Sequence, residues 1–160
     1  SYNDGKLTYF RLPEKKHTLA LEASQINFGK GILIKQGEDI SVIVTGPQVT
    51  NAVKASEILK TKNIDVEIIY MHTIKPIDEK LIINSALKTK RILTIEEASV
   101  RGGLGDEISM AAGYLRDIEF HRMGIGSSFI TYYGTYDEIC EKLGLDTAGI
   151  VNKIEEMVKE

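Results

Sequence analysis

The strongest constraint on the fold of this chain is a regular alternation between short apolar runs and segments of helical periodicity. Residues 40–45 and 66–71 are nearly all apolar, and each run precedes a stretch whose apolar positions recur every three or four residues. Units of about 25 residues repeated in this way need right-handed crossover connections, which build a parallel sheet with helices on both faces. The sequence therefore predicts an α/β fold, a three-layer sandwich around a mainly parallel sheet with one antiparallel edge strand.

The predicted elements follow from this periodicity. Strands are expected over residues 7–12, 32–34, 40–45, 66–71, 91–95 and 118–123. Helices are expected over residues 49–62, 78–87 and 104–115, and two more close the chain. The first of these last two begins at a capping box, Thr135 to Glu138. Residues 32–34 and 40–45 flank a turn and can pair as a hairpin.

Composition excludes several classes of protein. The 160 residues make one domain, and 20 basic against 23 acidic side chains give a net charge of −3, without the basic field that nucleic acids require. One cysteine rules out a disulfide within the chain, which points to a reducing, cytoplasmic location. No apolar run approaches the roughly 18 residues that span a membrane. The first residue is Ser1 rather than Met, so we expect a piece of a longer protein.

A glycine-rich turn between a predicted strand and helix is the first candidate site. Gly102, Gly103 and Gly105 lie at a helix start, where free N–H groups can bind an anion. The turn fails the dinucleotide pattern because its sixth position is Ile108, and four carboxylates around it would repel a pyrophosphate. We therefore favour a structural interpretation, in which the glycines allow a tight turn and close helix packing.

The other candidate residues have weaker patterns. His72 follows a strand at the edge where ligands bind in such sheets, but a ring that caps the next helix is the favoured interpretation. His17 and His121 have no partners in metal-ligand spacing, so no metal site is expected. Cys140 lies on the apolar stripe of its helix and is interpreted as a core residue.

Two acidic residues and one arginine complete the candidates. Glu96 and Glu97 resemble an acid/base pair, but adjacent strand residues point to opposite faces and cannot share a substrate while the strand continues. Arg11, at the end of an apolar strand, can hold a carboxylate or phosphate through two parallel hydrogen bonds. A surface ion pair is an equally good interpretation of Arg11.

Residues 71–78, Met-His-Thr-Ile-Lys-Pro-Ile-Asp, resemble a signature of the C-terminal domain of transketolases, especially the two-subunit bacterial and archaeal kind. Other parts match that domain in order and spacing: Thr45-Gly46, Glu96-Glu97 before residues 102–105, and residues 143–150. The resemblance covers nearly the whole chain. The same domain occurs in 1-deoxyxylulose-5-phosphate synthases and in the beta subunits of 2-oxo-acid dehydrogenases.

The resemblance implies a part of a thiamine-diphosphate enzyme that transfers a two-carbon ketol unit between sugar phosphates. Thiamine diphosphate and Mg²⁺ would be bound by diphosphate-binding and pyrimidine-binding domains or subunits outside this chain, in a homodimeric enzyme, and this chain alone would bind neither and be inactive. Residues 1–22 would be the closing strand and linker of the pyrimidine-binding domain, and residues 23–160 the C-terminal domain. Arg11 matches the family arginine that contacts the substrate phosphate.

The sequence also departs from the family pattern. Residues 126–134 stand where relatives have an Asp-Arg-Phe-Gly run, Ala98 replaces a His or Asn, and Glu14 and Lys15 replace the usual Gly or Arg. These differences leave the sugar acceptor open, with a specialised sugar pathway as one option. A related synthase or dehydrogenase component, and a regulatory or assembly module without an active site, are the alternatives.

Overall fold

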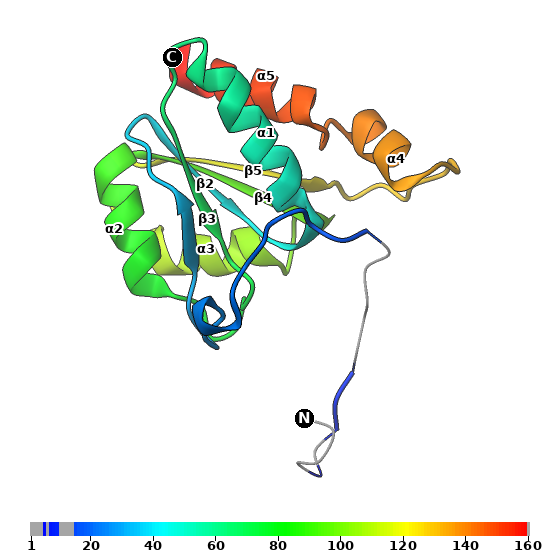
Figure 1. Ribbon diagram of the computed structural model, residues 1–160, viewed down its shortest axis with the longest axis horizontal. Helices are drawn as coiled ribbons and strands as arrows, with labels where there is room; N and C mark the ends of the chain where they lie inside the picture. The colour runs from blue at the N-terminus through cyan, green and yellow to red at the C-terminus, as the bar shows by residue number, and fades with distance from the viewer. Residues whose placement is uncertain (1–4, 6, 10–14, 160) are drawn as a thin grey trace.

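A central sheet of five strands separates two layers of helices in the computed structural model, which describes residues 5, 7–9 and 15–159 (Figure 1). The strand order is β1-β3-β2-β4-β5, and only the β1–β3 pair among these strands is antiparallel. The three-layer, mainly parallel architecture with one antiparallel edge strand is confirmed. The strands are β1 (Ile32–Lys35), β2 (Ile40–Val44), β3 (Val66–Tyr70), β4 (Arg91–Ser99) and β5 (Glu119–Ile125).

Two helices cover each face of the sheet (Figure 1). Helices α1 (Val49–Lys60) and α5 (Thr147–Lys159) lie on one face, and α2 (Glu79–Thr89) and α3 (Leu104–Ala112) on the other. Helix α4 (Tyr136–Leu143) precedes α5, and two short 3-10 turns, η1 (Ala23–Gln25) and η2 (Gly46–Gln48), precede β1 and α1. Among the residues described, no helix combines the length and apolar character needed to cross a lipid bilayer.

The central strands bury both of their faces, which explains their nearly continuous apolar sequence. Val42 and Val44 of β2 pack in the core beneath α1 and α5, whereas Ile43 packs in the core beneath α2 and α3. The same alternation in β3 sends Ile68 to the first core and Ile69 to the second. Cys140 is 4% exposed and belongs to the first core, as its helical position predicts.

The predicted hairpin of residues 32–34 and 40–45 is wrong, because β1 pairs with β3 rather than with β2. The connection between β1 and β2 passes over the start of β3, where the N–H groups of Glu38 and Asp39 both donate to the carbonyl of Asp65. A Cβ on Gly37 would overlap the backbone of Val66 there. The glycine thus allows the connection between β1 and β2 to pass close to the backbone of β3. In the sequence, this segment has only the pattern of an ordinary turn.

Most of the remaining boundaries lie within three residues of the prediction, but β4 runs to Ser99, four residues beyond its predicted end. The capping box at the start of α4 is confirmed, since Thr135 and Glu138 each bond the other's backbone N–H. The strand predicted over residues 7–12 is not found over residues 7–9, where Leu7 and Tyr9 are highly exposed and outside any strand. Its remaining residues, 10–12, lie outside the described residues.

Candidate functional site

A crevice at the carboxyl edge of the sheet lies between β2 and β4. The chain leaves β2 toward β3 on one side and later crosses to β4 on the other, so the strand order reverses at this point. In open α/β sheets, ligands bind at such a reversal, beyond the carboxyl ends of the strands. The crevice has a volume of about 390 Å³, and it is lined by Thr45, Gly46, Pro47, Ile74, Glu96, Glu97, Ala98 and Gly103.

Glu96 closes the floor of this crevice by binding the start of α3. Its side chain accepts the N–H of Leu104 at 2.9 Å and that of Gly105 at 3.0 Å, and the residue is only 2% exposed. A Cβ on Gly103 would overlap the Glu96 carboxylate, so the glycine is what allows the close approach. Two N–H groups that could bind an external anion are therefore already occupied by a carboxylate of the chain itself.

The glycine-rich turn is held together by a second carboxylate. Asp106 accepts the N–H of Gly102 at 2.5 Å and forms an ion pair with Arg122 of β5. The hydrogen bond from Gly102 lowers the pKa of Asp106 below its ordinary value, and Arg122 lowers it further. Gly102 has a φ of +79°, and a Cβ on Gly105 would lie 2.9 Å from Cδ of Arg122. These contacts are those of a tight, closely packed turn. A ligand role for Gly102, Gly103 and Gly105 stays a prediction.

Glu97 faces the opposite side of the sheet and lies beside Tyr136 of α4. The two carboxylates thus have different partners, as strand alternation predicts, but both line the crevice, and the expectation that they do not share a substrate stays a prediction. Burial raises the pKa of the Tyr136 hydroxyl, and the Glu97 carboxylate beside it raises that pKa further. Oε2 of Glu97 is buried and has no well-aligned hydrogen bond to any residue that the structure describes.

Tyr136 is also held from the interior by Gln48, which is fully buried. Nε2 of Gln48 donates to the Tyr136 hydroxyl at 3.0 Å and to Sγ of Cys140 at 3.2 Å. Sequence patterns missed Tyr136 and Gln48. In the sequence, Tyr136 is one member of an apolar helical stripe, and Gln48 is a polar residue at the start of a helix. Only the contact between them in the structure shows that both residues face the carboxyl edge of the sheet.

His72 does not cap the next helix, which corrects the interpretation favoured from the sequence. Asp78 caps α2 instead, accepting the N–H of Leu81 at 3.3 Å, as a short carboxylate side chain at this position does well. Nδ1 of His72 lies 3.0 Å from Oγ1 of Thr73, and its ring lies 6.2 Å from that of Tyr70. Nε2 of His72 is buried without a hydrogen-bond partner among the described residues. Its contact with a ligand stays a prediction.

Arg11 lies outside the described residues. The next described residue is Lys15, which lies beside the start of α4. Nζ of Lys15 lies 4.9 Å from the centre of the Tyr136 ring and forms an ion pair with Asp137. Lys15 departs from the family pattern, and the sequence gives no sign of this contact. The predicted phosphate contact of Arg11 stays a prediction.

The described residues do not fit a thiamine diphosphate or its metal ion. No group of three or more histidine, cysteine or acidic side chains among them could hold a metal. In the crevice, Glu96 and Glu97 place negative charge where a diphosphate would need positive charge.

Comparison with known proteins shows the family to which this chain belongs. The sequence matches the family described as transketolase, C-terminal domain, over residues 29–150. It is 37% identical over 157 residues to the putative transketolase C-terminal section of Methanocaldococcus jannaschii, covering 95% of this chain and 48% of the relative. It is 34% identical over 138 residues to a 6-deoxy-6-sulfo-D-fructose transketolase subunit of a Clostridium species (strain MSTE9), covering 86% of this chain and 42% of that subunit.

A synthase and a solved structure are similar as well. The 1-deoxy-D-xylulose-5-phosphate synthase of Listeria monocytogenes is 36% identical over 165 residues, which cover all of this chain and 27% of the synthase. A solved split gene transketolase, an inactive beta4 tetramer, superimposes with a TM-score of 0.74 at 27% identity over 84% of this chain and 45% of that chain. This chain thus spans less than half the length of each of these relatives. It is a member of the transketolase C-terminal domain family.

Proposed function

We propose that this chain is the C-terminal part of a thiamine-diphosphate enzyme that transfers a two-carbon ketol unit between sugar phosphates. The match to the transketolase C-terminal domain over residues 29–150 carries this proposal. Two of the similar proteins have names that describe transketolase subunits or sections. Because the described residues fit neither cofactor nor metal, the domain contributes assembly and part of the substrate site rather than the reacting groups.

The partners in this proposal are a diphosphate-binding and a pyrimidine-binding domain or subunit, in an enzyme that is a homodimer. Residues 1–22 serve as the closing strand and linker from the pyrimidine-binding domain, and residues 23–160 form the C-terminal domain. The structure of a split gene transketolase, titled a beta4 tetramer, is that of a relative divided into subunits, and it supports an assembly of this kind.

The proposed direct contribution of this chain to substrate binding is Arg11. A guanidinium keeps its charge at all physiological pH values and matches the geometry of an anionic group with two parallel hydrogen bonds. Either a phosphate or a sulfonate at the end of the sugar offers such an anion. The relative named for 6-deoxy-6-sulfo-D-fructose makes a sulfonated sugar a specific alternative to test.

The test compares Arg11→Ala with the unchanged protein in the assembled enzyme. KM for a phosphorylated ketose should rise by roughly tenfold to a hundredfold, as expected for the loss of a hydrogen bond to a charged group. KM for an unphosphorylated ketose should stay unchanged, and 6-deoxy-6-sulfo-D-fructose forms the third arm. Arg116→Ala, which changes an exposed arginine between α3 and β5, is the control. Equal effects on charged and uncharged ketoses would remove Arg11 from the anion site.

A second candidate activity is that of a 1-deoxy-D-xylulose-5-phosphate synthase. The similarity to the Listeria synthase extends over the entire chain and supports it. Product analysis separates the two activities, because a transketolase passes a two-carbon unit from a donor to an acceptor sugar, whereas the synthase forms the product in its name. Formation of 1-deoxyxylulose 5-phosphate by the assembled enzyme, without ketol transfer, would replace the first proposal with the second.

A further inference from the structure

The chain between Lys15 and β1 runs along the carboxyl edge of the sheet (Figure 1) and is attached at several points. The N–H of Thr18 donates to Oγ1 of Thr50 at 3.0 Å, and the ring of His17 packs edge-on against Tyr70 at 5.4 Å. Leu19 and Leu21 then pack against the core beneath α1 and α5. We call residues 15–21 the edge segment.

Lys15 is the first residue of the edge segment, and its side chain contacts the start of α4. Its ammonium group lies 4.9 Å from the centre of the Tyr136 ring and pairs with Asp137. A hollow of about 570 Å³ beside this contact is lined by Lys15 and by Gly134, Thr135, Tyr136 and Asp137. The Lys15 side chain is 39% exposed, so the contact can be altered without disturbing a core.

The ring that receives Lys15 is itself immobilised from the interior. Gln48 holds the Tyr136 hydroxyl at 3.0 Å, and Asn51 in turn donates to Oε1 of Gln48 at 3.2 Å. Asn51 also donates to the carbonyl of Leu145 at 3.2 Å, which joins α1 to the link between α4 and α5. Displacing the ring would break the partly buried hydrogen bond from Gln48, which is costly to leave unmade. Tyr136 therefore offers a fixed surface to whatever packs on it.

We propose that Tyr136 and Lys15 are positioning residues that fix the point at which the preceding chain leaves this domain. The inference rests on the proposed function, because Arg11 stands four positions before Lys15 in the sequence. Four residues extend over at most about 14 Å, so an anchor at Lys15 limits where the Arg11 backbone can go. Loss of the anchor widens that range and weakens anion binding without changing any group that touches the substrate.

The first test measures amide hydrogen exchange at Thr18 in this chain. Lys15→Met removes the charge but keeps most of the side-chain length, and it should speed exchange about twofold to fivefold, as expected for an exposed cation–π contact. Lys15→Arg should restore the slow exchange. Tyr136→Leu removes the ring beneath Lys15 and also the hydroxyl that Gln48 binds, so it should speed exchange at least as much. Lys15→Met should add less in the Tyr136→Leu background than it does alone, because the shared contact is already lost.

Lys142→Met is the matched control. Nζ of Lys142 lies 4.4 Å from the centre of the Tyr132 ring, an equivalent contact at the other end of α4 that does not involve the edge segment. It should leave exchange at Thr18 unchanged. Unchanged exchange in Lys15→Met, or equal effects of Lys15→Met and Lys142→Met, would overturn the inference whatever the enzyme does.

The second test uses the assembled enzyme. Lys15→Met should raise KM for a phosphorylated ketose about twofold to fivefold, with kcat and the KM for an unphosphorylated ketose unchanged. Faster exchange at Thr18 with no change in the ratio of the two KM values would overturn the link to anion binding. If the enzyme without any substitution does not transfer a ketol unit, the proposed function is refuted instead. The hydrogen-exchange data would then still decide whether Tyr136 and Lys15 anchor the edge segment.

Discussion

At the scale of single residues, the end of β4 shows how strand geometry separates two adjacent carboxylates. Glu96 turns toward α3 and is satisfied by two backbone N–H groups, whereas Glu97 turns toward α4 and lies beside a tyrosine hydroxyl. Because the side chains of a strand alternate between its faces, neighbours in sequence become parts of different layers. The two side chains therefore contact two different helices, α3 and α4.

Asp106 makes the stability of the glycine-rich turn depend on pH. Its pKa is lower in the folded protein than its ordinary value of 3.8, first through the N–H of Gly102 and then through Arg122. A carboxyl group with a lowered folded pKa stabilises the fold at pH values above its unfolded pKa, and this contribution disappears as the pH falls through the folded pKa. Asp106→Asn should thus lower the free energy of unfolding at pH 7, and the difference should shrink as the pH falls below about 4.

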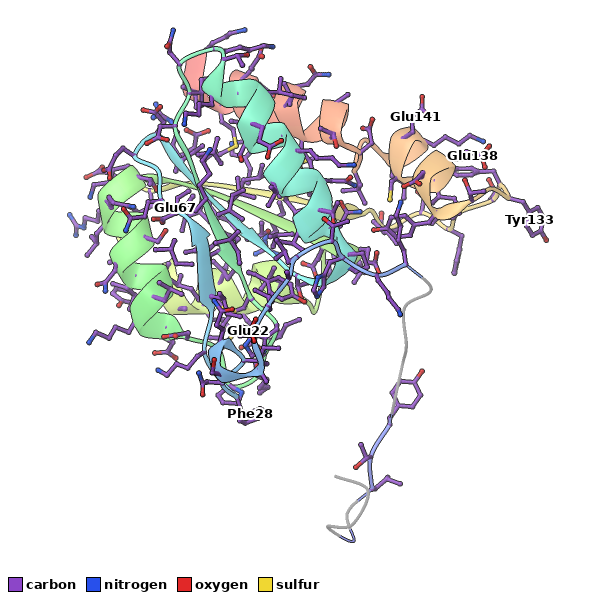
Figure 2. The ribbon with its side chains drawn as sticks, in the orientation of Figure 1. Glu22, Phe28, Glu67, Tyr133, Glu138 and Glu141 are labelled. Carbon is purple, nitrogen blue, oxygen red and sulfur yellow. The ribbon has the colours of Figure 1, made fainter. Side chains whose placement is uncertain are left out.

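Denaturant titrations between pH 2 and pH 7 would measure this difference. Glu141→Gln is a suitable control, since Glu141 is exposed on α4 (Figure 2) and forms no ion pair with any described residue. It should leave the pH profile unchanged. A constant difference between Asp106→Asn and the unchanged protein across the whole pH range would contradict the assigned role.

At the scale of elements, α2 is fastened to the sheet by a buried polar cluster centred on Glu67 (Figure 2). Glu67 of β3 accepts hydrogen bonds from Ser41 of β2 and from Ser85 and Lys88 of α2, and the residue is 3% exposed. A buried carboxylate is tolerated only when its acceptors are satisfied in this way. The cluster lies near the amino ends of β2 and β3, away from the crevice.

Glu67→Gln should therefore reduce stability without altering substrate binding. It removes the charge from hydrogen bonds that are worth about 1.5–3 kcal/mol each when one partner is ionised, so we expect a loss of that order. Urea denaturation should show a lower midpoint with an unchanged slope, which indicates a change in stability alone.

Glu38→Gln provides the control for this change, because Glu38 contacts the same Lys88 at 3.9 Å but its side chain is 73% exposed. Exposed ion pairs contribute little, and we expect a change below about 0.5 kcal/mol. Equal losses for the two variants would mean that Lys88, rather than the burial of Glu67, sets the energy of the cluster.

Elements with strong local patterns were predictable from the sequence, whereas contacts between distant elements were not. The apolar runs of β2 and β3 and the capping box of α4 depend on nearest neighbours, and the structure confirms them. The pairing of β1 with β3 requires the chain to pass close to the backbone of β3 at Gly37. The surroundings of Glu97 include Tyr136, which comes from the later helix α4. Neither contact has a local pattern, because each is created only when the layers assemble.

At the scale of the whole molecule, the chain is a domain with a well-packed core. The described residues at the carboxyl edge of its sheet supply few reactive groups. Both helical layers have closed cores around the sheet. At the edge, Ile26 and Phe28 near β1 and Phe129 and Tyr133 before α4 are exposed, and Tyr133 projects away from the sheet (Figure 2).

The last prediction concerns the cofactor. Titration of this chain alone with thiamine diphosphate and Mg²⁺ in a calorimeter should give no binding heat, because its crevice holds two carboxylates and its described residues lack a cluster of metal ligands. Addition of the remaining domains or subunit should produce binding. Micromolar affinity of the isolated chain for thiamine diphosphate would contradict the proposal that other domains or subunits bind the cofactor. A changed affinity in Glu97→Gln would then show that the crevice is the binding site.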